Sequence, residues 1–210
     1  MIRYDRRAQA AAISLAVIAG FVDAIGYIAL GGFFVSFMSG NSTRLSVGLV
    51  TGSPNAAVAV GLIGAFVSGV VLGSLAARSA LKAHTTAILL LVSALLVLAA
   101  TLAGWGLRPV ALATVALAMG VENTAFERDG QASIGLTYMT GTLVRLGRHL
   151  AAAILGGSAF AWIPDLLLWL GLVAGAVAGT ALYPVLGLQA LWIAAVAAAT
   201  LGLLLRRRAE

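Results

Sequence analysis

The chain has 210 residues, of which 61% are hydrophobic and 10% are charged, and its mean hydropathy is +1.06. A soluble domain of this length could not cover so much apolar surface with so few charges, so the composition indicates an integral membrane protein. The net charge of +6 comes from basic residues at the ends of apolar segments, which argues against a nucleic-acid-binding protein. The chain has no Cys, which excludes disulfides and thiolate metal sites.

Six apolar segments are long enough to cross about 30 Å of hydrocarbon as helices. The predicted spans are residues 10–29, 56–76, 86–105, 110–126, 163–182 and 188–205. Their long runs of Ala, Leu, Val and Gly do not alternate in polarity, so strands of a β-barrel are not expected. The first segment contains Asp23 and is too long for the apolar core of a signal peptide, so we expect an uncleaved first helix. The predicted fold class is an all-α integral membrane protein.

The basic residues predict the orientation of the spans. With six spans and a cytoplasmic N-terminus, eleven of the 13 Lys and Arg residues lie on the cytoplasmic side, and only Arg44 and Arg108 lie on the other. With eight spans, residues 33–51 and their counterpart would also cross, but Arg78 and Lys82 would then lie outside. We therefore expect six spans and cytoplasmic termini.

One motif occurs twice, about 100 residues apart. Its first copy comprises Asp23, Met38, Ser39, Gly40, Asn41, Arg44 and Leu45, and its second comprises Glu122, Met139, Thr140, Gly141, Thr142, Arg145 and Leu146. The repeat divides one membrane domain into residues 1–107 and 108–210. Each half has three spans, an odd number, so the second half should be inverted relative to the first.

Glycines at a spacing of four also recur in the second and fifth spans. Gly69 and Gly73 match Gly175 and Gly179. Small residues at this spacing let two helices approach closely in lipid, so we expect the second and fifth spans to pack tightly against each other.

Residues 33–52 are too polar in the middle to cross lipid and too apolar for an open loop, which predicts a broken or re-entrant segment. A short helix is expected to start at Ser39–Asn41, where the residues suit an N-cap and a hinge, and to run toward Val50. Its twin is expected to start at Thr140–Thr142 and to run to about Leu155. Backbone amides at such helix starts favour an anion.

The repeated charges need partners. An arginine near a helix start meets the positive end of the dipole, and an unpaired carboxylate at mid-membrane costs about 2.5 to 3.5 kcal/mol. We therefore expect Asp23 and Glu122 to lie near Arg44 and Arg145 around a central axis. Two interpretations stay open: static ion pairs that fix the packing, or arginines that bind a solute, with acids that titrate. Asn123 could equally bind a solute or make a hydrogen bond that joins two helices.

The first functional hypothesis is a secondary transporter of a small anionic or polar solute, with proton coupling through Asp23 or Glu122. The candidate substrate-binding residues are Asp23, Ser39, Asn41, Arg44, Glu122, Asn123, Thr140, Thr142 and Arg145. The alternative is a non-transporting scaffold or assembly partner with structural ion pairs, and an intramembrane enzyme comes third. The expected partners are the lipid bilayer and the solute, and a homodimer stays open.

Motifs for catalysis or cofactor binding are not found. The chain has no phosphate-binding glycine loop, nucleophile elbow or zinc-protease helix. His84 and His149 have no acid or Cys at ligand spacing, so a metal site is not predicted. Trp105, Trp162 and Tyr183 lie near span ends and are expected to be interface anchors.

Three stretches resemble the YoaK-like family of small bacterial inner-membrane proteins, a domain-of-unknown-function family. They are residues 21–27 (FVDAIGY), 30–41 (LGGFFVSFMSGN) and 135–142 (GLTYMTGT). The resemblance covers nearly the whole chain and implies six helices, a bacterial inner membrane and no established activity. A weaker similarity, in residues 69–87 and 175–192, is to a helix hairpin of major facilitator transporters and implies a half-size relative that works as a dimer.

Overall fold

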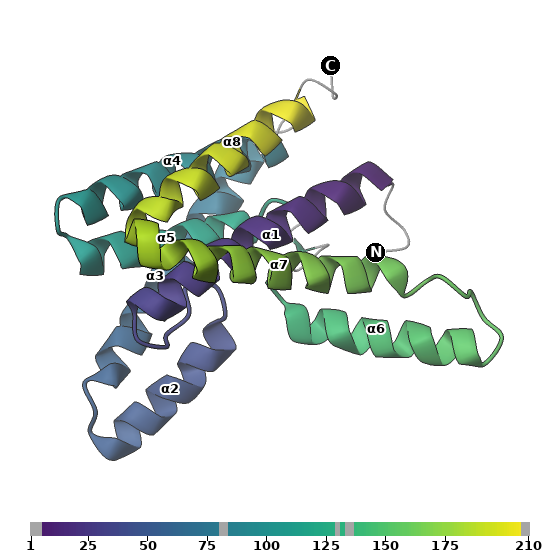
Figure 1. Cartoon of the computed structure of the whole chain (residues 1–210), viewed down its shortest axis with the longest axis horizontal. Coiled ribbons are helices and arrows are strands. Elements are labelled where there is room, and N and C mark those ends of the chain that lie inside the picture. The colour runs from purple at the N-terminus through teal and green to yellow at the C-terminus, as the bar shows by residue number, and fades with distance from the viewer. Residues whose placement is uncertain (1–5, 80–83, 129–130, 133–136, 207–210) are drawn as a thin grey trace.

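The computed structural model describes residues 6–79, 84–128, 131–132 and 137–206. In chain order the elements are α1 (Arg6–Ala29), α2 (Met38–Thr51), α3 (Asn55–Ser79), α4 (His84–Gly104), α5 (Arg108–Glu122), the antiparallel pair β1 (Glu127–Arg128) and β2 (Gln131–Ala132), α6 (Met139–Ile154), α7 (Ile163–Leu186), the 3-10 turn η2 (Gly187–Ala190) and α8 (Leu191–Arg206), as Figure 1 shows. The all-α membrane class is confirmed, with one two-residue strand pair added. Gly135 and Leu136 lie outside the described residues, as do four of the eleven basic residues assigned above to the cytoplasmic side, which are Arg3, Lys82, Arg207 and Arg208.

Four stretches of the described chain are long and apolar enough to cross a membrane. They are Ala8–Ala29, Asn55–Ala77, His84–Gly104 and Ile163–Arg206. The last stretch has 44 residues, but Gly187 at its middle has φ 54°, and the chain folds back there into two separate rods, α7 and α8 (Figure 1). It therefore holds both of the spans predicted after residue 162.

The predicted span at residues 110–126 is shorter than expected. Its helix, α5, has 15 residues and is about 22 Å long at 1.5 Å per residue. The helix ends at Glu122 because the chain then makes tight turns, in which the Thr124 and Ala125 amides donate to the carbonyls of Val121 and Glu122.

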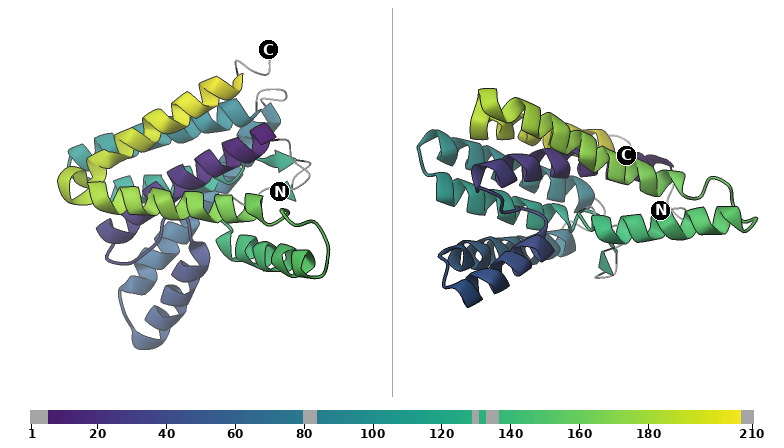
Figure 2. Two further views of the ribbon diagram at one scale, coloured as in Figure 1. Left: turned by 45° about the vertical axis from the view of Figure 1, so that its right-hand side comes forward. Right: turned by 60° about the horizontal axis from the view of Figure 1, so that its bottom comes forward.

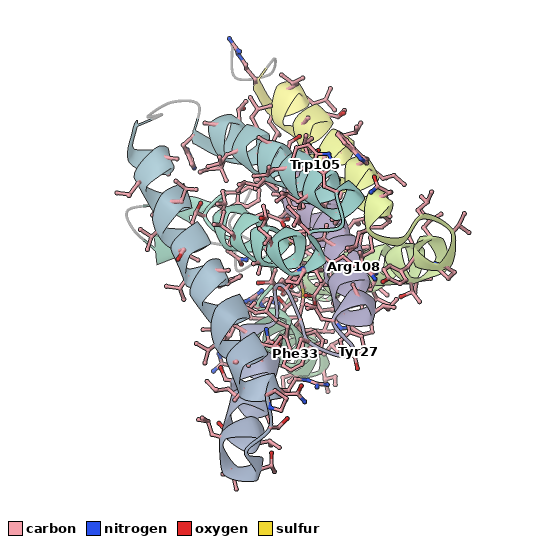
Figure 3. All side chains as sticks on the ribbon, turned by 90° about the vertical axis from the view of Figure 1, so that its left-hand side faces the viewer. Tyr27, Phe33, Trp105 and Arg108 are labelled. Atoms are coloured by element: carbon pink, nitrogen blue, oxygen red, sulfur yellow. The ribbon has the colours of Figure 1, made fainter. Side chains whose placement is uncertain are left out.

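Five helices, α1, α4, α5, α7 and α8, run roughly along one direction, whereas α3 crosses them steeply (Figure 1). In Figure 1, α1, α4 and α7 begin at the right-hand end, whereas α5 and α8 run back toward it. Figure 3 looks at the opposite end, where α1 finishes and α4 turns into α5, and where Trp105 lies apart from Tyr27 and Phe33 with Arg108 between them. The Trp105 side chain is 73% exposed, as expected of an interface anchor.

The α1–α7 crossing is close because glycines lie on both helices. A Cβ atom on Gly175 would overlap the carbonyl oxygen of Val17, and one on Gly20 would overlap that of Leu172. Gly179 faces the backbone of Phe21 one turn further along. The two backbones are therefore in direct contact, which any larger residue would prevent.

The α3–α5 crossing repeats this arrangement. A Cβ atom on Gly69 would overlap the carbonyl oxygen of Leu117, and one on Gly120 would overlap that of Phe66. The predicted contact between the second and fifth spans is therefore wrong. The helices α3 and α7 each pack against the first span of the other half, because α5 and α1 carry the glycines that match theirs.

Hydroxyl groups join α4 to α8. The Thr86 hydroxyl donates to the carbonyl of Gly202 (3.1 Å), and the Ser93 hydroxyl donates to that of Ala195 (2.8 Å). Such bonds satisfy polar side chains that lipid could not, and so they fix the register of the two helices.

Candidate functional site

The chain turns back on itself after α1. Gly31 and Gly32 have positive φ angles (63° and 104°), which reverse its direction. One oxygen of Asp23 then accepts the backbone N–H groups of Val35 (2.9 Å) and Ser36 (2.8 Å). This segment therefore returns along α1 to the level of Asp23.

Asn41 fixes the same segment from the other side. Its side chain is buried, accepts the N–H of Phe34 (3.0 Å) and donates to the carbonyl of Phe34 (2.7 Å). Helix α2 begins at Met38, one residue before the predicted start, but no side chain caps it. The predicted N-cap role is wrong, because Asn41 is occupied by Phe34 and the exposed Ser39 makes no capping bond.

The second half uses different groups at the corresponding place. Asn123 donates to the carbonyl of Met119 (2.8 Å) and accepts the hydroxyl of Thr137 (2.9 Å), which ties the end of α5 to the start of α6. Helix α6 begins at Met139, again one residue before the predicted start. Thr142 is buried, whereas Thr140 is exposed.

Glu122 has no such support. Its side chain is fully buried at the end of α5, and among the described residues neither carboxylate oxygen has a hydrogen-bond partner. Asp23, at the matching place in the first half, accepts two backbone amides. The two repeated acids therefore differ: one is anchored and the other is buried without any donor.

Arg145 belongs to an ion-pair cluster on the α6–α7 hairpin. Its Nε lies 3.1 Å from Oδ1 of Asp165, and its Nη2 donates to the hydroxyl of Thr142 (2.9 Å). Nδ1 of His149 lies 2.9 Å from Oδ2 of Asp165. The predicted pairing of Arg145 with Glu122 is wrong, because α6 packs along α7 and meets the carboxylate there.

Sequence reasoning missed Asp165, which is fully buried in the first turn of α7. Two signals could have found it. An acid that follows a proline at the start of an apolar helix is favoured by the dipole and also needs a partner. Arg145 and His149 are four residues apart on one helix face, which suits a shared carboxylate.

Arg44 has no carboxylate within salt-bridge distance among the described residues. Its guanidinium carbon lies 4.8 Å from the centre of the Phe33 ring, and one of its terminal nitrogens lies against Gly32. The predicted Asp23–Arg44 pair is absent because backbone amides occupy Asp23. The hairpins that carry Arg44 and Arg145 leave the bundle at different places (Figure 1 and the right view of Figure 2).

Comparison with known proteins places the chain in a family. A family model described as "Protein of unknown function (DUF1275)" matches residues 11–204. The chain belongs to the DUF1275 family. A relative, "UPF0700 transmembrane protein RA0705" of Rhizobium meliloti (strain 1021), is 43% identical to this DUF1275 protein over 192 residues, which cover 91% of this chain and 82% of the relative. No solved structure matches.

These comparisons confirm the predicted membership of a family of small membrane proteins of unknown function. They also agree with the long apolar helices in identifying this DUF1275 member as a transmembrane protein.

Proposed function

We propose that this DUF1275 protein is a secondary transporter of the bacterial inner membrane with both termini in the cytoplasm. It consists of two inverted halves of three spans each, and it moves a small anionic or polar solute together with protons that bind at Glu122. Glu122 is the observation that carries the proposal.

The packing of the two halves supports the inverted arrangement. Gly20 of α1 contacts Leu172 of α7, and Gly120 of α5 contacts Phe66 of α3. Leu172 follows Phe66 by 106 residues, which is also the separation of Gly69 from Gly175. Equivalent helices therefore make equivalent contacts across the halves, and the first spans α1 and α5 run in opposite directions (Figure 1). A pseudo-two-fold axis in the membrane plane relates such halves.

A buried Glu122 without a donor suits a proton-coupling residue. A carboxylate anion in such a place is unfavourable, so the neutral acid is favoured until water reaches it. Proton release then requires a change of conformation, and this links the proton to an opening of the bundle. Asp23 is held by two amides and serves as the fixed acid of the pair.

The starts of α2 and α6 supply the proposed solute contacts. Asn41 binds the start of α2 to Phe34, and Asn123 binds Thr137, just before α6, to the end of α5. Ser39, Thr140 and Thr142 lie in the first turns of these two helices. The positive ends of two half-helices at such places favour an anionic group. Arg145 extends this contact set in the second half.

A specific observation favours the alternative of a non-transporting scaffold. Asp165 binds both Arg145 and His149, so one intramembrane charge cluster is already satisfied without a solute. In the scaffold reading this cluster fixes the α6–α7 hairpin and Glu122 stays protonated.

Proteoliposomes that enclose a pH-sensitive dye test the proposal. A panel of small carboxylates, phosphate and neutral polar metabolites is added outside, and we expect at least one of them to change the internal pH. In Glu122→Gln, uptake of the radiolabelled solute should persist while the internal pH no longer changes, since the amide cannot carry a proton. If folded protein in the vesicles exchanges none of the solutes, the scaffold is favoured instead.

A further inference from the structure

The two repeated arginines have different surroundings. Arg145 pairs with Asp165 of the second half. The equivalent position in the first half, 106 residues earlier, is occupied by Ala59. The first half therefore has no equivalent of Asp165, the acid that pairs with Arg145. Arg44 is half-buried, and no carboxylate among the described residues balances its charge.

An open groove of about 190 Å³ lies beside Arg44, between α2 and α3. It is lined by Thr43, Arg44, Val47, Gly48, Thr51, Ser53 and Asn55. None of these residues is acidic, so the groove has one positive charge and no negative one. Phe33 covers one face of the guanidinium group, which leaves its edge with the N–H donors free for a ligand.

Other donors line the same groove. The Ser53 oxygen accepts the backbone N–H of Asn55 (3.3 Å), so its own hydroxyl proton can be donated to a ligand. The Asn55 side-chain amide is exposed and makes no hydrogen bond within the described part of the chain that would compete with a ligand. By contrast, the hydroxyls of Thr43 and Thr51 already donate to carbonyls within α2.

We propose that this groove binds a phosphate group, either of an anionic phospholipid or as free inorganic phosphate. A guanidinium edge matches two phosphate oxygens, and the hydroxyl and amide donors that line the groove can add hydrogen bonds to the same group. Val47 and Val50 lie exposed beside the groove, with Val50 at 90%, and offer a surface for an acyl chain. The site is separate from Glu122, so it holds whether or not the chain transports a solute.

The test measures binding to the full-length protein in detergent. Native mass spectrometry with added phosphatidylglycerol or phosphatidylcholine reports lipid retention, and thermal-shift titration with inorganic phosphate reports the free anion. We expect Arg44→Gln to weaken binding by about tenfold or more, since a hydrogen bond to a charged group is lost. The matched control is Arg108→Gln, an exposed arginine at the end of the bundle shown in Figure 3, which should bind like the parent.

The two arms distinguish the source of the phosphate. Retention of phosphatidylglycerol without a response to inorganic phosphate identifies the lipid, and the reverse identifies the free anion. Asn55→Ala changes an exposed side chain and should weaken binding by about threefold, even if Arg44→Gln fails to fold. The proposal is overturned if neither ligand binds the parent, or if Arg44→Gln and Arg108→Gln reduce binding equally.

Discussion

Arg145 and Asp165 are the residues whose pairing has the clearest energetic consequence. Asp165 is fully buried, whereas the Arg145 side chain is 37% exposed, so the acid depends on the pair more than the arginine does. Removing one partner of a buried pair leaves the other charge without compensation, and this usually costs more than the pair itself contributes.

Arg145→Gln should therefore lower the free energy of unfolding by about 1 to 3 kcal/mol, because His149 alone remains beside Asp165. Adding Asp165→Asn should recover most of that loss, since a neutral amide needs no counter-charge. Thermal unfolding in detergent measures both variants. Arg148→Gln, an exposed change on the same helix, should stay within about 0.5 kcal/mol of the parent. A double variant as unstable as Arg145→Gln would show that Asp165 does not need the arginine.

The sequence identified most of the charged residues of this region but not their partners. Asp23 and Arg145 were recognised because a repeated charge in an apolar chain is conspicuous. Asp23, however, is satisfied by backbone amides of Val35 and Ser36, which no pattern of side chains reveals. Arg145 pairs with Asp165 because α6 packs along α7, and the sequence alone did not show which helices pack together.

At the level of helices, the close crossings depend on single glycines. Gly175 and Gly69 each face a carbonyl oxygen of the partner helix, whereas nothing lies within 4 Å of a Cβ atom on Gly61. All three glycines lie inside helices, so Gly61 can serve as the control for Gly69 and Gly175.

Gly175→Ala and Gly69→Ala should each lower the free energy of unfolding by about 1 to 3 kcal/mol, since the added methyl group forces two backbones apart. Gly61→Ala should leave it unchanged or raise it slightly, because alanine is the better helix former. Melting curves of the three purified variants decide this. Equal melting temperatures for all three would mean that the helices do not cross at these glycines.

Helix positions were predictable within a few residues because apolar length is read directly from the sequence, as α1, α3 and α4 show. Gly69 and Gly175 alone did not predict which helices pack against each other. Small residues at a spacing of four predict a close contact but not the helix that makes it. Gly20 and Gly120, which lie at the same crossings on the partner helices, are not part of a four-residue repeat of glycines.

For the whole molecule, the proposed transport mechanism requires that the second half be inverted relative to the first. The α2–α3 turn and the α6–α7 turn occupy equivalent places in the repeat, and they point away from different ends of the bundle in Figure 1. In a membrane, inverted halves would expose them on opposite sides. Halves related by an axis along the membrane normal would expose both on the same side.

The most direct test uses the absence of Cys from the chain. Asn55→Cys places a single thiol in the α2–α3 turn, and Ser158→Cys places one in the α6–α7 turn, both at exposed positions. A membrane-impermeant maleimide added to intact cells should label Asn55→Cys at once, and Ser158→Cys only after the membrane is opened. Labelling of both thiols from the same side would contradict the inverted architecture and, with it, the carrier built on that architecture.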